Sequence, residues 1–178
     1  NLIQIRLGFT TLTMEWKSPE YQIAFEKNFK NLTPSPKNLS SKIWKVPVCY
    51  EAPFSTDLER LANEKGISQS ELIRLHSDSL YRIHFFGFLP GFMYLKGLPI
   101  LLHTPRKKIP DRTVPAGSVA IGGEQTGIYP QQSPGGWHII GQTPIPLFSA
   151  KLEPPVWAQI GDQVRFVPIS SQYFQELE

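Results

Sequence analysis

Residues 114–143, VPAGSVAIGGEQTGIYPQQSPGGWHIIGQT, decide the fold of this 178-residue chain. Apolar runs such as GSVAIGG and GWHIIGQT are only a few residues long, and glycine and proline separate them, which is typical of short strands joined by tight turns. Between Gly87 and Pro146 the chain holds ten glycines and nine prolines. Many short strands with such turns favour a closed barrel over an open sheet.

The same pattern continues on both sides of this stretch. Upstream, IWKVPVCY and YRIHFFGF are strand candidates, and downstream PLFSA, PVWAQI and QVRFVPI are further ones. The segment QIGDQVRF carries a Gly–Asp pair that is typical of a hairpin turn. Residues 45–178 are therefore expected to form one mainly β barrel domain.

Two short helices are predicted between the first two of these strands. Thr56 and Glu59 form a capping box before DLERLANEKG, a run that ends at Gly66. Ser68 and Glu71 form a second capping box before ELIRLHSD. The barrel is therefore expected to carry two consecutive helices.

Residues 1–33 have a different pattern. IQIRLGFTTLTMEW alternates with a period of two, which predicts a strand broken near Gly8. A helix is predicted to begin at Pro19, because apolar residues then recur at helical spacing. These are Tyr21, Phe25, Phe29 and Leu32. One strand and one helix cannot cover both faces of a sheet, so the segment is expected to be the last part of an α/β domain, joined to the barrel by a polar linker at 34–44.

Composition and charge exclude several classes of protein. The net charge is +3, from 18 Lys and Arg against 15 Asp and Glu, which is too small to indicate nucleic-acid binding. No run of about 18 apolar residues predicts a membrane helix, and no secretory leader is recognisable. Cys49 is the single cysteine, which excludes an internal disulfide and a cysteine zinc site and favours a cytoplasmic location. It lies in an apolar strand and is expected to be buried and inert.

The stretch FFGFLPGFMYLKGLP, residues 85–99, is too apolar for an ordinary loop and too rich in glycine and proline for a helix or a central strand. We expect a stiff loop that presents aromatic rings. Phe85 and Phe88 are expected in the core. Phe92 and Tyr94 are expected to line a cleft, where the Tyr94 hydroxyl can orient a polar group.

Two long segments carry a family resemblance, GFLPGFMYLKGLP and TPRKKIPDRTVPAGSVAIGGEQTGIYPQQSPGGWHIIGQTP. They resemble the signature of the 5-oxoprolinase B-subunit family, which is also called allophanate hydrolase subunit 1 and includes the kinase inhibitor KipI. The resemblance extends from Val46 to Pro168 and implies a cyclophilin-like β-barrel. It also implies that IRLGFTTLTMEW is the last strand of the family's N-terminal α/β domain, most of which lies outside this sequence.

The resemblance and the residue chemistry together suggest catalytic residues. The product and the acyl-phosphate stage of the family reaction are anionic, so Arg106 and Arg112, in a proline-rich loop, are predicted to bind anions and to act in catalysis. Their neighbours Lys107 and Lys108 are expected to be merely exposed. His76 is the one histidine predicted to be catalytic, because its position in LHS resembles the family's pattern.

A set of substrate-binding residues is predicted around the glycine-rich turns. Gln125 and Tyr129 offer hydrogen bonds suited to a lactam or an amide, and Trp137 offers a flat apolar wall, although a purely structural role fits Trp137 equally well. Phe92 and Tyr94 complete the set. The glycine pairs are not followed by Lys and Ser or Thr, so they are expected to form tight hairpins and close backbone approaches rather than a phosphate loop. The histidines lack metal-ligand spacing, so no metal site is predicted.

The resemblance implies the B subunit of an ATP-dependent 5-oxoprolinase, which opens 5-oxo-L-proline to L-glutamate together with an A and a C subunit. The chain has no nucleotide loop and no paired carboxylates beside a nucleophile, so it is expected to be inactive alone, to complete a site across an interface and to rely on a partner for ATP. Two alternatives stay open: a KipI-type inhibitor of sensor histidine kinase autophosphorylation, and an allophanate hydrolase subunit. The site requires that Tyr94, Arg106, Arg112 and Trp137 share one pocket.

Overall fold

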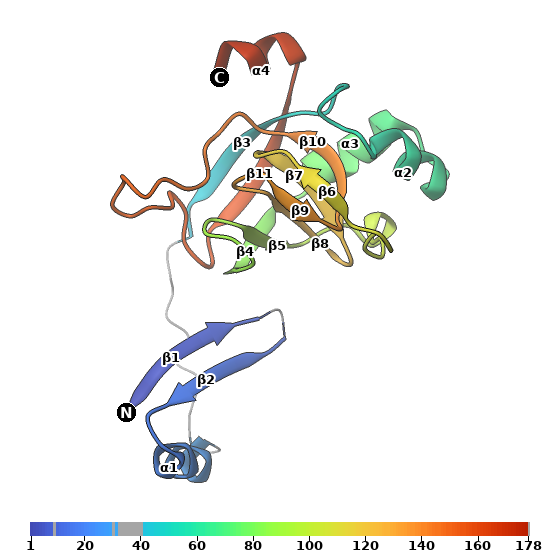
Figure 1. Ribbon diagram of the computed structural model, residues 1–178. Coiled ribbons are helices and arrows are strands. Elements are labelled where there is room, and N and C mark those ends of the chain that lie inside the picture. The colour runs from blue at the N-terminus through green and yellow to red at the C-terminus, as the bar shows by residue number, and fades with distance from the viewer. Residues whose placement is uncertain (9, 30, 32–40, 178) are drawn as a thin grey trace. The chain divides into compact units, whose positions relative to one another are not determined.

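A computed structural model describes residues 1–8, 10–29, 31 and 41–177. It divides the chain into two compact units, residues 1–40 and 41–178 (Figure 1). Most of the predicted linker at 34–44 lies outside the described residues, and its last two residues, Ile43 and Trp44, already belong to a strand. The predicted domain boundaries, at residues 33 and 45, therefore stay a prediction.

The second unit is a closed barrel of seven strands in the order β10-β3-β11-β4-β5-β8-β7. Neighbouring strands are antiparallel except β3 and β11, which run parallel. The barrel strands are β3 (Ile43–Cys49), β4 (Tyr81–Phe86), β5 (Met93–Lys96), β7 (Ser118–Gly122), β8 (Gln125–Ile128), β10 (His138–Gln142) and β11 (Gln163–Ile169). A separate two-stranded sheet pairs β6 (Asp111–Val114) with β9 (Ser133–Gly135). The mainly β, cyclophilin-like barrel is therefore confirmed.

The two predicted helices are present as α2 (Leu58–Lys65) and α3 (Gln69–Asp78). Gly66 ends α2 with a left-handed φ of 67°, which glycine adopts without strain. At the start of α3, the Ser68 hydroxyl accepts a hydrogen bond from the Glu71 N–H at 3.1 Å, as predicted. The first capping box is wrong, because α2 is preceded by Asp57 as its N-cap. The Asp57 carboxylate makes no cap bond, since it accepts one from the Ile139 N–H instead.

The barrel interior is filled by aliphatic and aromatic side chains that alternate along the strands. In β4, Tyr81, Ile83 and Phe85 are buried while their neighbours are not, which is the pattern of a strand with one face in the core. Figure 1 shows α2 and α3 beside the barrel, where α3 packs on β11 and α2 on β10. Each fully buried side chain of this kind contributes about 1.5–3 kcal/mol of transfer free energy, which opposes the loss of chain entropy on folding.

Two strand predictions and one turn prediction are wrong. PLFSA and PVWAQI form no strand, and the two prolines at 154 and 155 explain the second case because proline cannot donate to a ladder. The pair Gly161 and Asp162 does not turn a hairpin; it bonds instead to both backbone groups of Ile83. Conversely, β5 is a central strand inside the stretch that looked too broken for one, since its four residues lie between Gly91 and Gly97.

Two further elements cover the barrel unit. A 3₁₀-helix follows β5 at Ile100–Leu102, and α4 (Ser171–Leu177) ends the described chain and packs on β3. Its Phe174 is buried against Phe54, with ring centroids 4.3 Å apart. The buried thiol of Cys49 agrees with the predicted inert cysteine.

The first unit is a hairpin and a helix. β1 (Leu2–Leu7) and β2 (Leu12–Trp16) pair antiparallel, so the predicted break near Gly8 is a chain reversal rather than an interruption of one strand. Helix α1 begins at Pro19, as predicted, and ends at Phe29, while Leu32 lies outside the described residues. The helix buries none of its residues.

Candidate functional site

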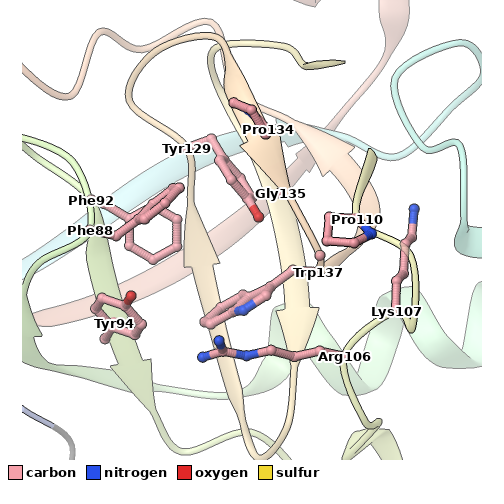
Figure 2. A pocket seen from close by; sticks show the side chains of 11 residues that line it. Phe88, Phe92, Tyr94, Arg106, Lys107, Pro110, Tyr129, Pro134, Gly135 and Trp137 are labelled. Carbon is pink, nitrogen blue, oxygen red and sulfur yellow. The ribbon is translucent and has the colours of Figure 1, made fainter. Parts of the chain in front are cut away.

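A pocket of about 320 Å³ lies against strands β5, β7 and β8, beside the small β6–β9 sheet (Figure 2). This is near the lower end of the range of about 300–1,000 Å³ that small-molecule sites occupy. The lining residues are Phe88, Phe92, Tyr94, Arg106, Lys107, Pro110, Tyr129, Pro134, Gly135, Gly136 and Trp137. Five of the predicted site residues therefore meet here: Phe92, Tyr94, Arg106, Tyr129 and Trp137.

Trp137 forms the floor of the pocket, because two glycines let its indole lie directly on the sheet. A Cβ atom at Gly122 in β7 would lie 2.6 Å from the indole, and one at Gly127 in β8 would lie 3.0 Å from it. Neither position tolerates a side chain while Trp137 stays in place. The predicted close backbone approach of the glycine-rich segment is therefore confirmed, and Trp137 is what approaches.

Aromatic rings surround this floor. Phe92 meets Trp137 edge-on with ring centroids 5.5 Å apart, and it meets Tyr129 in the same way at 5.1 Å. Tyr94 stacks on Phe85 at 4.1 Å, which fixes its ring at the pocket wall. Such contacts stabilise each other by about 0.5–1.5 kcal/mol per pair beyond the burial of area. The pocket is thus a pre-formed apolar wall with tyrosine hydroxyls on it.

Arg106 brings the positive charge. Its guanidinium carbon lies 5.6 Å from the Trp137 ring centroid, within cation–π range. Figure 2 shows the side chain beside the Trp137 indole, reaching toward Tyr94. No carboxylate within the described part of the chain forms an ion pair with it. The charge of Arg106 is therefore available to a ligand.

The loop that carries Arg106 is fixed on both sides. Thr104 exchanges two backbone hydrogen bonds with Gly123, at 2.9 and 2.7 Å, and the Lys107 N–H donates to the Gly136 carbonyl at 2.7 Å. His138 Nε2–H donates to the Pro105 carbonyl at 2.7 Å, while its Nδ1 accepts from Arg60. The residues before and after Arg106 are thus both fixed by hydrogen bonds.

Lys107 was expected to be exposed, and this is wrong. Its ammonium lies 2.7 Å from Asp57 and 2.5 Å from Asp111, and only 15% of its side chain is exposed. Burial by itself would raise the pKa of Asp57, but hydrogen bonds from Lys107, the Ile139 N–H and Arg60 outweigh it and lower that pKa. Figure 2 shows the ammonium pointing away from the rings. Of the two cations that line the pocket, only Arg106 is uncommitted.

The two tyrosine hydroxyls of the pocket stay neutral at physiological pH. Burial raises the pKa of both Tyr94 and Tyr129; a hydrogen bond from the Trp137 backbone N–H to Tyr129, and the charge of Arg106 near both, offset this only in part. Both tyrosines line the same pocket as Arg106. The pocket therefore offers one permanent cation, two neutral hydrogen-bonding groups and apolar faces, which suits a small anion attached to a ring.

Arg112 and Gln125 are not brought into the pocket. Arg112 lies exposed on β6, outside the lining residues. Gln125 is buried in β8, and its amide nitrogen has no hydrogen-bond partner within the described residues, yet it does not line the cavity either. The expected pocket of Tyr94, Arg106, Arg112 and Trp137 thus forms without Arg112.

His76 lies in the barrel core and not in the pocket. The Thr126 hydroxyl donates to the Ala120 carbonyl, so it accepts from His76 Nε2–H at 2.9 Å, and His76 Nδ1 accepts from the Tyr50 hydroxyl at 2.8 Å. The ring stacks on Phe166 at 4.6 Å. Complete burial lowers the pKa of His76 to about 3. These contacts are those of a neutral structural residue, and they give the predicted catalytic role no support.

Phe88 is a pocket residue that sequence reasoning missed. It was expected in the core, but 60% of it is exposed at the pocket rim. The sequence signal for an exposed Phe88 was its place between Gly87 and the Leu89–Pro90 pair, because Gly and Pro mark turns and turns lie on the surface.

The described residues hold neither a metal cluster nor a membrane helix. No group of three or more His, Cys, Asp or Glu side chains among them has the arrangement to hold a metal ion. In the same residues, no helix combines the length and apolar character that a membrane span needs.

Comparison with known proteins places the chain in a family. A family model described as "Carboxyltransferase domain, subdomain C and D" matches residues 1–158. The protein named as the B subunit of 5-oxoprolinase from Escherichia coli O157:H7 is 47% identical over 128 residues, which are 72% of this chain and 59% of that protein. Its namesake from Bacillus subtilis (strain 168) is 42% identical over 134 residues, 75% of this chain and 56% of that protein. The chain therefore spans less than two thirds of these relatives' length.

A solved structure resembles nearly the whole chain. The conserved uncharacterized protein PH0987 from Pyrococcus horikoshii matches with a TM-score of 0.72 at 36% identity, over 97% of this chain and 81% of that one. The fold, the sequence relatives and the family model agree. The predicted family is confirmed: the chain belongs to the family of the carboxyltransferase domain, subdomains C and D, together with the relatives named as 5-oxoprolinase B subunits.

Proposed function

We propose that this chain is part of the B subunit of an ATP-dependent 5-oxoprolinase and helps to open 5-oxo-L-proline to L-glutamate, with the A and C subunits as partners. The observation that supports this most is the uncommitted Arg106 stacked on Trp137 in a small aromatic pocket. 5-Oxoproline is a five-membered lactam with one carboxylate, and the relatives carry the name of this enzyme's B subunit.

The pocket groups match the parts of this substrate. The Arg106 guanidinium would pair with the carboxylate, or with the negative charge that develops during reaction. The Tyr94 and Tyr129 hydroxyls, which stay protonated, would donate hydrogen bonds to the lactam oxygen. The rings of Phe92 and Trp137 would pack against the apolar ring atoms. Substrate orientation is thus the contribution that this chain makes to the reaction.

The pocket does not fit ATP. A triphosphate carries several negative charges, and Arg106 is the single uncommitted cation of the lining, because Lys107 is held between Asp57 and Asp111. The glycine turns nearby carry no phosphate-loop Lys. We therefore assign ATP, which would supply the driving force for opening the unreactive lactam, to a partner polypeptide, and we derive no step of its chemistry from this chain.

The pocket also lacks a group that could activate water. None of its lining residues is a histidine, cysteine or carboxylate, and the nearest carboxylates, Asp57 and Asp111, are bound to Lys107. A catalytic base must then come from another polypeptide. This supports a site completed at an interface between subunits and activity only in the assembled enzyme.

Reconstitution tests the proposal. The chain is mixed with the A and C subunits from the same genome, 5-oxoproline and ATP, and glutamate and phosphate are measured. We expect both products in equal amounts, and neither when the chain is omitted. A well-folded, complete mixture that releases neither product would contradict the proposal. Inhibition of a sensor histidine kinase by the chain, with no 5-oxoproline turnover, would favour the KipI-type alternative.

A further inference from the structure

Phe88 combines two unfavourable features that the barrel itself does not need. Its φ is +64°, the only positive φ at a non-glycine position among the described residues. The Leu89 N–H donates to the Gly87 carbonyl at 2.7 Å, so Phe88 is the centre of a three-residue turn of the strained, positive-φ kind. In addition, 60% of this large apolar residue faces solvent.

Glycine would form the same turn without strain. Phenylalanine there adds backbone strain, leaves apolar surface in water and fills no space in the core. A large apolar side chain at such a position is more consistent with a contact that the isolated barrel lacks. The position of the ring indicates what that contact is.

The Phe88 ring stands at the rim of the pocket. It meets Phe92 edge-on at 5.5 Å and Tyr129 edge-on at 6.2 Å. A second hollow, of about 320 Å³, is lined by residues 86–91, so Phe88 contributes to both. Phe88 thus borders both hollows, and its ring stands beside Phe92 and Tyr129 at the rim of the first.

We propose that Phe88 is the wall that sets the size of the ring accepted by the pocket. The strained turn holds the phenyl group over the mouth, and a bound five-membered ring covers the exposed phenyl face. A larger ring meets the phenyl group and is excluded. This inference rests on the proposed function only in taking the ligand to be a ring that bears a carboxylate, for which Arg106 provides the charge.

Two variants separate the ring from the backbone strain. Phe88→Ala removes the phenyl group and keeps a Cβ atom at positive φ, whereas Phe88→Gly removes both. Ile109→Ala is the matched control, because Ile109 is an apolar residue that is 83% exposed and does not line the pocket. Binding of 5-oxoproline and of its six-membered homologue, 6-oxopiperidine-2-carboxylate, to each 178-residue chain is measured by calorimetry, and melting temperatures are recorded.

We expect both Phe88 variants to bind 5-oxoproline about tenfold more weakly than the parent chain and to lose most of the preference for the five-membered ring. Phe88→Gly should melt about 2–4 °C above Phe88→Ala, since only glycine fits the turn without strain. Ile109→Ala should match the parent chain in affinity and ring preference.

The outcomes distinguish this inference from the proposed function. Parent-like affinity and ring preference in both Phe88 variants would overturn the role of Phe88, and so would a parent chain that binds neither ring. Turnover in the reconstituted enzyme decides the proposed function separately. A chain that binds both rings with the expected Phe88 dependence, in an enzyme without 5-oxoproline turnover, would keep the role of Phe88 and remove the proposed substrate.

Discussion

The barrel core around His76 and the pocket around Arg106 use polar groups in opposite ways. In the core, both ring nitrogens of His76 have a hydrogen-bond partner. The Thr126 hydroxyl, which accepts one of these bonds, donates its own hydrogen bond to a backbone carbonyl. In the pocket, the Arg106 charge is unpaired in the described chain, and two tyrosines line the same cavity. Complete internal pairing is thus the mark of a structural residue here, and an available charge beside apolar rings is the mark of a binding site.

The contrast predicts which substitution removes stability and which removes function. Deleting a buried polar residue lowers the free energy of unfolding strongly, because its partners lose their hydrogen bonds and a cavity remains. Removing the pocket cation should change the free energy of unfolding little, because no ion pair within the described chain depends on it. Substitutions in the core should therefore act on unfolding, and substitutions in the pocket should act on turnover.

The largest effect is expected for His76→Ala. The change leaves the Tyr50 hydroxyl without its acceptor and opens a cavity against Phe166, so the free energy of unfolding should fall by about 3 kcal/mol. Urea denaturation followed by circular dichroism measures it. His103→Ala is the control, since His103 makes one hydrogen bond to a carbonyl and should cost only about 1 kcal/mol. If both variants lost the same free energy of unfolding, the stabilising role of His76 in the core would be contradicted.

Arg106→Ala should reduce activity while leaving the fold intact. We expect kcat/KM of the reconstituted enzyme to fall about 100-fold or more, which corresponds to roughly 3 kcal/mol of transition-state stabilisation. Arg106→Lys should recover only part of this, because an ammonium cannot make a bidentate pair with a carboxylate. The melting temperature should change by less than about 2 °C. A large fall in melting temperature with normal activity in the folded fraction would reverse the assignment.

Acid should destabilise the barrel through His76. Its pKa is about 3 in the folded protein and 6.5 in the unfolded chain, so the unfolded chain binds the proton first as pH falls. Stability from this residue is complete above pH 6.5 and is lost toward pH 3, by about 2 kcal/mol at pH 5. Asp57, whose pKa is also lowered, acts in the same direction at lower pH.

Urea denaturation at about pH 7.5 and about pH 5 tests this dependence. His76→Gln keeps a donor toward Thr126 but cannot titrate, so the difference between the two pH values should shrink by about 2 kcal/mol in this variant. An unchanged difference would show that other groups cause the acid sensitivity.

The smallest effect is expected for Arg112→Ala. Arg112 was predicted beside Arg106, yet it is exposed and outside the pocket. Activity of the reconstituted enzyme should stay within about twofold, and the melting temperature within about 2 °C. A loss as large as that of Arg106→Ala would place Arg112 at a site that the partner subunits complete.

The sequence was informative where one local pattern determines the outcome. Glycine and proline spacing predicted the barrel, and the Ser68 capping box predicted the start of α3. Phe92, Tyr94 and Trp137, which the sequence proposed for the substrate-binding set, line one pocket. The prediction of Arg106 came from its proline-stiffened loop and the anionic chemistry that the family resemblance implies.

The sequence failed where a long-range contact decides. Lys107 looked like its exposed neighbour Lys108; Asp111 is a local partner, but Asp57, far earlier in the chain, completes the buried ion-pair cluster. His76 resembled a family pattern, and its burial beside Thr126, fifty residues along the chain, is what leaves the predicted catalytic role without support. Neither fact is encoded in the residues next to the one concerned, so no local rule could have found it.

The bare glycine surface beneath Trp137 limits how the pocket can be redesigned. The floor is an indole resting on main chain, so a library of substitutions at Gly122 or Gly127 would expel the indole rather than resculpt the cavity. Useful diversity is confined to the rim, at Phe88 and along the loop from Thr104 to Asp111. Efforts to retarget the protein to a new ring compound should therefore concentrate their variants on those few positions and leave the strands unchanged.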